Sequence, residues 1–150
     1  MNITSRVFDR TDNDQKTVTC HDEQGNAFFE TVTASGEVAL SFTEGAYQGR
    51  TITAFCWIVC DPAKGDRVNV TEESTGMRLA MVQMGNLSTK GAIFSYNPTD
   101  AEYNAAMPDI IKVCAVAAFD RFQRASKEQL NSMMNTIDQL PKVSDKRVLH

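Results

Sequence analysis

Hydrophobic and polar residues alternate in short runs over the first two-thirds of the chain, and turn-forming residues separate these runs. The clearest alternation lies in residues 37–43, where Val38, Leu40 and Phe42 share one face. Strands are predicted at residues 3–8, 16–21, 27–33, 37–43, 51–59, 67–72, 77–83 and 91–96. About eight short strands of this kind predict an antiparallel β meander, folded into a highly curved sheet or a partial barrel.

The run at residues 51–59 has a different pattern from the others. It is rich in β-branched and aromatic side chains, and from Ala54 onward apolar residues fall on both faces. A strand that is apolar on both faces is buried on both faces, so this strand is predicted to be central in the sheet.

Beyond residue 97 the pattern becomes helical. Thr99 and Glu102 have the spacing of a capping box, which predicts a helix start at this point. Pro108 is expected to interrupt this helix, with a second helix beginning at Asp109. Residues 110–122 are apolar nearly all round, which predicts a buried helix.

A last helix is predicted after Ser126, which forms a second capping pair with Gln129, and Pro141 ends it. It carries an apolar stripe of Leu130, Met133, Met134, Ile137 and Leu140. Methionine-rich stripes pack adaptably, either into the protein's own core or against another chain. The stripe therefore leaves both intramolecular docking and a partner or homodimer interface open.

These elements predict one α+β domain over residues 1–141, with β structure in residues 1–97 and C-terminal helices in residues 98–140 that pack on or in the sheet. Residues 142–150 continue neither pattern and are expected to form a flexible tail.

Composition narrows the classes of function. The hydrophobic fraction of 42% and the charged fraction of 23% are ordinary for a globular protein. The net charge of −4 and the lack of a Lys/Arg cluster argue against nucleic-acid binding. No apolar stretch is long enough for a membrane span, and the first six residues lack the apolar core of a signal peptide, so no export is expected. The four cysteines are expected to be free thiols in a cytoplasmic protein.

Candidate catalytic and metal-binding residues are few. Cys20 and His21 are adjacent, but neighbours on a strand point to opposite faces, so they are not expected to form a catalytic dyad without a β-bulge. Cys56 and Cys60 lie too far apart along a strand to share a zinc ion or a disulfide, so both are expected to be buried free cysteines. No glycine-rich phosphate loop is present, and no cofactor or metal is predicted.

One catalytic alternative stays open, a small hydrolase-type enzyme that uses a thiol or converging carboxylates, because the fold could bring four carboxylates together. They are Glu30, Glu37, Asp61 and Asp66. Sequence spacing does not show whether they converge.

Candidate partner-binding residues come from two segments. Tyr47 and Gln48 lie in a glycine-flanked turn, where an aromatic side chain is expected to be exposed and adaptable. The helical stripe adds Leu130, Met133, Met134 and Ile137. The missing catalytic signatures and this surface predict a non-enzymatic interaction protein of the inhibitor, immunity or adaptor type, with another protein as its partner.

The string at residues 22–29, the meander that follows it, and the apolar helix at residues 110–119 closing with Asp120 resemble the pattern of tubby-like and LURP-one-related barrels. The resemblance implies a C-terminal helix that threads the barrel, and binding of a small ligand or lipid headgroup. That family's barrel has more strands than the sequence predicts here. A small-ligand or lipid-headgroup-binding barrel is thus the second expectation for function.

Overall fold

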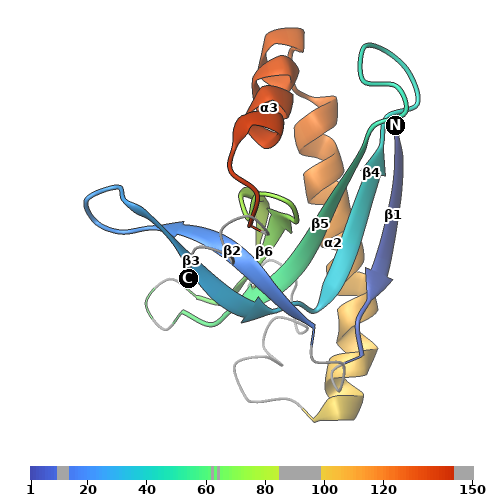
Figure 1. The fold of residues 1–150 in the computed structure, drawn as a ribbon. Helices are drawn as coiled ribbons and strands as arrows, with labels where there is room; N and C mark the ends of the chain where they lie inside the picture. The colour runs from blue at the N-terminus through green and yellow to red at the C-terminus, as the bar shows by residue number, and fades with distance from the viewer. Residues whose placement is uncertain (10–13, 62, 64, 85–98, 144–150) are drawn as a thin grey trace.

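The computed structural model describes residues 1–9, 14–61, 63, 65–84 and 99–143. Five strands form an antiparallel sheet in the order β1-β4-β5-β6-β7, and β2 pairs with β3 in a separate hairpin (Figure 1). The large sheet comprises β1 (Asn2–Val7), β4 (Gly36–Ser41), β5 (Thr51–Val59), β6 (Arg67–Glu72) and β7 (Arg78–Gln83), and the hairpin comprises β2 (Gln15–His21) and β3 (Ala27–Thr33). The prediction that residues 51–59 form the central strand is confirmed.

The α+β class and the antiparallel strands are confirmed, whereas the barrel is not. The seven described strands lie at predicted positions, and the eighth, at residues 91–96, lies outside the described residues. The described strands form two separate sheets, because the β2–β3 hairpin leaves the meander and β1 pairs directly with β4. Only β4 to β7 follow one another as a meander within the large sheet.

Two helices follow the strands, α2 (Asp100–Gln123) and α3 (Lys127–Gln139). Both predicted capping boxes are present, Thr99 with Glu102 and Ser126 with Gln129. The predicted break at Pro108 is wrong, since α2 continues through it. Proline lacks one helical hydrogen bond and disfavours the preceding turn, but buried residues on both sides of it hold the helix against the sheet.

The predicted burial of residues 110–122 is confirmed along one face of α2, whereas the opposite face is exposed. Met107, Ile110, Cys114 and Ala118 are buried at helical spacing. Val116 on the opposite face is 57% exposed. In the part of the chain that the structure describes, no helix combines the length and apolar character needed to cross a membrane.

The main core lies between α2 and one face of the large sheet. Alternate residues of the strands point into it, among them Val38, Leu40, Val68 and Val70. Helix and sheet meet closely at Gly36, where an added Cβ would lie 2.7 Å from Ile111 Cδ1. The added Cβ would also lie 2.8 Å from the Arg6 carbonyl oxygen. A side chain larger than glycine at residue 36 would therefore clash with the backbone of β1 as well as with the Ile111 side chain.

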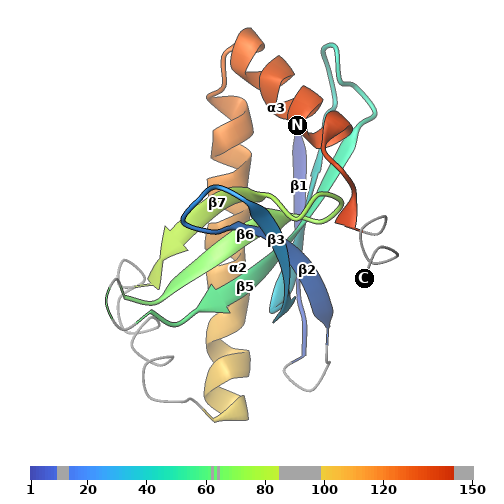
Figure 2. The same ribbon diagram turned by 60° about the vertical axis from the view of Figure 1, so that its left-hand side comes forward.

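The β2–β3 hairpin crosses the opposite face of the large sheet, so that α2 and the hairpin lie on either side of it (Figures 1 and 2). A second cluster of buried residues forms there, with Val18 from the hairpin and Phe55 from β5 among its members. Trp57 is half-buried beside this cluster. The hairpin covers only part of the sheet face, and this incomplete cover creates the cleft described below.

Candidate functional site

Tyr47 and Gln48, predicted to contact a partner, lie in the loop between β4 and β5. The Tyr47 hydroxyl donates a hydrogen bond to Asn131 Oδ1 at 2.6 Å, and its ring lies 5.8 Å from that of Phe42. Gln48 is exposed. Tyr47 is therefore engaged within the chain, where it joins this loop to α3.

The apolar stripe of α3 faces the protein's own core. Met134 and Ile137 are buried, and Leu130 and Met133 are half-buried against the same cluster. An ion pair between Arg50 and Asp138, with Nη2 and Oδ1 2.7 Å apart, fixes the C-terminal half of the helix beside β5. The structure thus brings Tyr47 and the apolar stripe of α3 together, and their apolar side chains pack against the protein's own core.

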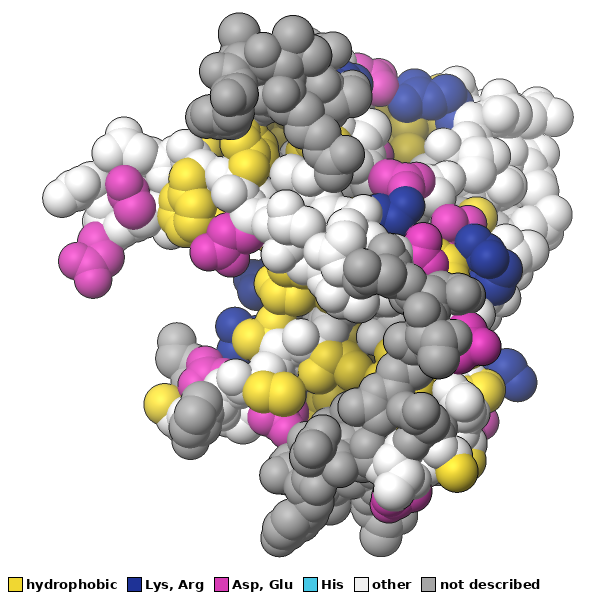
Figure 3. All heavy atoms as spheres, turned by 60° about the horizontal axis from the view of Figure 1, so that its bottom comes forward, with side chains coloured by type: hydrophobic (Ala, Val, Ile, Leu, Met, Phe, Trp, Pro, Cys, Tyr) yellow, Lys and Arg dark blue, Asp and Glu magenta, His cyan; other side chains and the backbone are white. Residues whose placement is uncertain are grey.

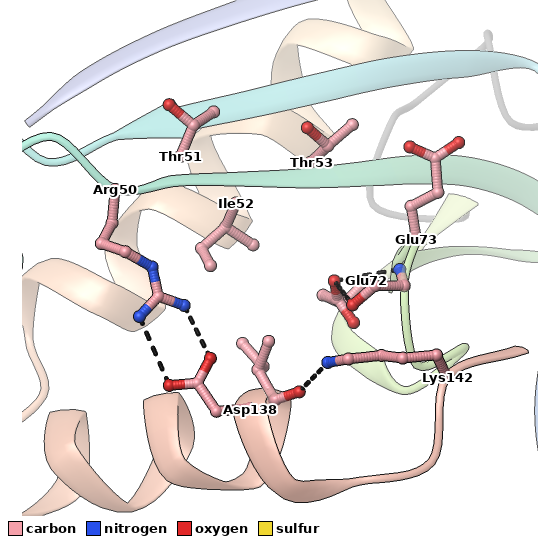
Figure 4. A pocket seen from close by; sticks show the side chains of 10 residues that line it. Arg50, Thr51, Ile52, Thr53, Glu72, Glu73, Asp138 and Lys142 are labelled. Carbon is pink, nitrogen blue, oxygen red and sulfur yellow. Dashed lines mark hydrogen bonds and ion pairs between the residues drawn. The ribbon is translucent and has the colours of Figure 1, made fainter. Parts of the chain in front are cut away.

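A hollow of about 350 Å³ lies between the start of β5 and the C-terminal end of α3 (Figure 4). Its charged side chains are engaged within the chain: Arg50 pairs with Asp138, Lys142 Nζ donates to the Ile137 carbonyl, and Glu73 pairs with Lys16. Glu72 is buried and accepts hydrogen bonds from Ser74 and Thr75. These contacts, called the clamp below, hold the C-terminal end of α3 against the sheet. A ligand in this hollow would have to break the existing ion pairs and hydrogen bonds.

The clamp also includes the first residues of the expected flexible tail. The Val143 amide donates to the Ser74 carbonyl at 2.9 Å, next to the Lys142 contact. The rest of that segment, residues 144–150, lies outside the described residues.

A larger cleft of about 610 Å³ lies between the hairpin and the open face of the large sheet. Figure 3 shows a hollow beside the β2–β3 hairpin, which projects to the left as in Figure 1, and hydrophobic, acidic and basic side chains border it. The cleft is lined from the hairpin by Val18, Thr19, Cys20, His21 and Glu30, and from the sheet by Trp57, Val59, Arg67, Asn69, Thr71, Gly76, Met77 and Arg78.

Strand register explains which sheet residues form the floor of this cleft. Trp57 on β5 lies opposite Asn69 on β6, which lies opposite Met81 on β7. Residues that pair directly across strands point to the same face, so these side chains form one row. The hairpin packs on the neighbouring row, which contains Phe55. The row that contains Trp57 and Asn69 is only partly covered by the hairpin, so these two residues line the cleft.

Short-range contacts fix the hairpin at this position. The Thr19 amide donates to the Gly76 carbonyl and the Thr19 hydroxyl to the Thr75 carbonyl, each at 2.8 Å. Gly76 has a φ of +73°, and an added Cβ would lie 2.9 Å from the Thr19 nitrogen. Glycine at residue 76 therefore allows the β6–β7 turn to contact β2 directly. These contacts attach the hairpin wall of the cleft to the sheet wall at the β6–β7 turn.

Two polar atoms of the sheet wall stand out. Asn69 is 7% exposed, and its Oδ1 atom is buried without a hydrogen-bond partner among the described residues. The same holds for Arg67 Nε, although the Nη1 atom of Arg67 contacts Asp61 Oδ2 at 3.3 Å. Leaving a buried polar atom unpaired costs about 1–3 kcal/mol, so such atoms in folded proteins call for an explanation.

The hairpin wall brings together some of the residues of the predicted enzyme alternative. The Cys20 thiol donates to Glu30 Oε2 at 3.7 Å, and burial, followed by the Glu30 charge, raises the pKa of Cys20. A thiol with a raised pKa is protonated at neutral pH and is a poor nucleophile. His21 also lines the cleft.

The four candidate carboxylates do not form one site. Glu30 lines the cleft and Asp61 lies at its edge beside Arg67, whereas Glu37 is on β4, paired with Arg6. Asp66 precedes β6. Within the described ranges, no three His, Cys, Asp or Glu side chains are grouped as metal ligands would be.

The remaining cysteines correct one expectation. Cys56 is buried and contacts Cys114 on α2, and the hydrogen bond between the two thiols raises the pKa of Cys56. Cys60, expected to be buried, is exposed because it follows the end of β5. All four cysteines are free thiols.

Sequence reasoning missed Arg67, Asn69 and Arg78 as cleft residues. A signal was present in β6, where Arg67, Asn69 and Thr71 alternate with valines. This alternation indicates a strand with one polar and one apolar face. A polar face on a strand next to the central one indicates a sheet surface that another element does not fully cover.

Comparison of the chain with protein-family models, with characterised proteins and with solved structures finds no match.

Proposed function

We propose that this chain is a binding protein, and that it holds a small organic ligand in the cleft between the β2–β3 hairpin and the open face of the large sheet. The observation that carries the proposal is that Asn69 lines the cleft while its buried Oδ1 atom has no hydrogen-bond partner among the described residues. A ligand that drew the Asn69 side chain toward the cleft and supplied a hydrogen-bond donor to its Oδ1 atom would remove the cost of leaving this acceptor unpaired. That cost would become part of the free energy of binding.

The size and lining of the cleft support the same proposal. Its volume of about 610 Å³ lies within the range of roughly 300–1,000 Å³ that is typical of small-molecule sites. Trp57, Val59 and Met77 supply apolar surface, and a few polar groups from Arg67 and Asn69 lie beside them. Such sites usually combine a mostly apolar lining with a small number of placed polar groups.

Binding explains the cleft better than catalysis does. The Cys20 thiol has a raised pKa, and Glu30 is the one carboxylate among the described lining residues. A general acid–base pair or an activated nucleophile would need a second ionisable group in contact with it. His21 also lines the cleft, but no interaction joins it to Cys20 or Glu30 among the described residues. The surface of Tyr47 and α3 is a weaker candidate, because its apolar side chains already pack within the chain.

Trp57 provides a direct readout, since it is the only tryptophan in the chain and it lines the cleft. We expect a ligand to change the emission of Trp57 and to raise the melting temperature in a small-molecule screen. A ligand at one hundred times its Kd stabilises the folded state by about 2.7 kcal/mol. If no compound class changes either signal, the proposal is wrong.

Asn69→Leu separates a binding role from a structural one. Replacing an unpaired buried amide with an apolar side chain of similar size is expected to leave the free energy of unfolding unchanged or to raise it, while ligand binding is lost. The matched control is Asn135→Leu on the exposed surface of α3, which should alter neither property. A large loss of stability in Asn69→Leu would show that this amide serves the fold, and would remove the main support for the proposal.

A further inference from the structure

We infer that the ligand is bipolar, of the amino-acid type, with a carboxylate that faces the sheet wall and an ammonium group that faces the hairpin wall. This inference rests on the proposed binding function. It follows from the distribution of charge in the cleft, since the sheet wall carries Arg67 and Arg78 and the hairpin wall carries Glu30.

The sheet wall carries about one positive charge that no carboxylate among the described residues compensates. Arg67 is partly neutralised by Asp61, at 3.3 Å, whereas no described carboxylate pairs with Arg78. Arg78 lies opposite Thr71 in the register of β6 and β7, one row along the sheet from Asn69. A single carboxylate matches this surplus, whereas a phosphate carries more charge and would leave part of it uncompensated.

The hairpin wall offers the opposite charge. Glu30 is exposed toward the cleft and accepts a hydrogen bond from the neutral Cys20 thiol, which leaves its negative charge uncompensated by that contact. An ammonium group of the ligand would pair with it. Trp57 on the floor adds an aromatic face, which also attracts cations.

The middle of the cleft fits the rest of such a molecule. Val59, Met77 and the Trp57 ring can cover an apolar side chain. The ammonium group has three N–H donors, so one can bond to Asn69 Oδ1, the acceptor on which the proposed function rests, while another pairs with Glu30. The same chemistry occurs in free amino acids and in short peptides, which differ in the distance between their charged ends. The experiment below therefore tests free amino acids and dipeptides separately.

The test uses Trp57 fluorescence and calorimetry on the full chain with the standard L-amino acids and their homodipeptides. The tightest binder of either set is then compared with its C-terminal amide, which lacks the carboxylate, and with its N-acetyl form, which lacks the ammonium group. We expect each derivative to bind at least tenfold more weakly, a loss of about 1.4 kcal/mol.

Two variants assign each charge to its wall. In Arg78→Gln the parent compound and its amide should bind equally weakly, and in Glu30→Gln the parent and its N-acetyl form should do so. Arg124→Gln is the matched control, because the Arg124 side chain, at the C-cap of α2, is 84% exposed and does not line the cleft. Its affinity for the parent compound should be unchanged.

The outcomes distinguish this inference from the proposed function. If both derivatives bind as tightly as the parent, or if only other compounds change Trp57 emission, the ligand is not bipolar and the binding function stands. If no compound of any class binds, both are wrong. Weaker binding of both derivatives with no change in Arg78→Gln or Glu30→Gln would overturn the assignment to these two walls.

Discussion

The Tyr47 hydroxyl donates a hydrogen bond to Asn131 Oδ1 at 2.6 Å, between residues 84 positions apart in sequence. The contact joins the β4–β5 loop to α3 at a half-buried position. Together with the Arg50–Asp138 ion pair it attaches the last described helix to the sheet from the same loop. Loop and helix therefore act as one structural unit.

Tyr47→Phe tests this unit. The substitution keeps the ring beside Phe42 and removes only the hydroxyl, so we expect the free energy of unfolding to fall by about 1 kcal/mol. Urea denaturation measures the change. Gln48→Ala in the same loop is the control and should have no effect, because Gln48 is exposed. If Tyr47→Phe has the stability of the parent protein, the bond contributes nothing in solution.

Met134→Ala tests the docking of α3 on its own core. Met134 is fully buried, and truncation of a buried methionine typically costs about 2–5 kcal/mol. The neighbouring Met133 is half-buried, so Met133→Ala should cost clearly less. The loss in Met134→Ala should not depend on protein concentration. A stability that fell on dilution would instead indicate that α3 packs against a second copy of the chain.

Local sequence signals predicted most of the fold. Both helix starts followed from capping pairs, and the central position of β5 followed from its apolar residues on both faces. The departure of the β2–β3 hairpin from the meander was not predictable, because it depends on which strand β1 pairs with. Strand pairing is a long-range choice, and alternation within a strand does not specify its neighbour.

The candidate site was harder to predict for the same reason. Cys20, Glu30 and Trp57 were each noticed, but their common cleft exists only because the hairpin crosses the sheet. Tyr47 was expected to be free because glycines flank it, and the acceptor that engages it, Asn131, lies far away in the sequence. Residue type suggested what each side chain could do, and topology decided which of them met.

Pro108→Ala tests why α2 continues through a proline. A proline in a helix interior costs about 3 kcal/mol relative to alanine, and residue 108 is exposed, so alanine gains a helical hydrogen bond without disturbing the core. We expect the free energy of unfolding to rise by about 1–3 kcal/mol, as measured by chemical denaturation. An unchanged or lower value would mean that α2 already accommodates the missing bond by a local change in geometry.

The Arg50–Asp138 pair predicts a dependence of stability on acid. The hydrogen bond from Arg50, and then its charge, lower the pKa of Asp138 below its usual range. A carboxyl whose pKa is lower in the folded state stabilises the fold above its unfolded pKa and loses this contribution as the pH falls through the folded pKa. Melting temperatures of Asp138→Asn should therefore approach those of the parent protein at low pH. In an Arg50→Gln background the same substitution should make a much smaller difference, because only the Lys142 charge then lowers the pKa of Asp138.

Cys20 and Glu30 predict a change in thiol reactivity. Because burial and the Glu30 charge raise the pKa of Cys20, little thiolate is present at neutral pH, and alkylation by iodoacetamide should be slow. Glu30→Gln removes the negative charge that Cys20 faces, so the pKa should fall and alkylation at neutral pH should become faster. A Cys60→Ser background removes the exposed thiol, and Cys56 and Cys114 are buried, so the reaction then reports on Cys20. The pH profile of the alkylation rate gives the pKa directly. An identical profile in both proteins would mean that Glu30 does not face Cys20 in solution, and the hairpin wall of the cleft would then lack the charge that the bipolar ligand requires.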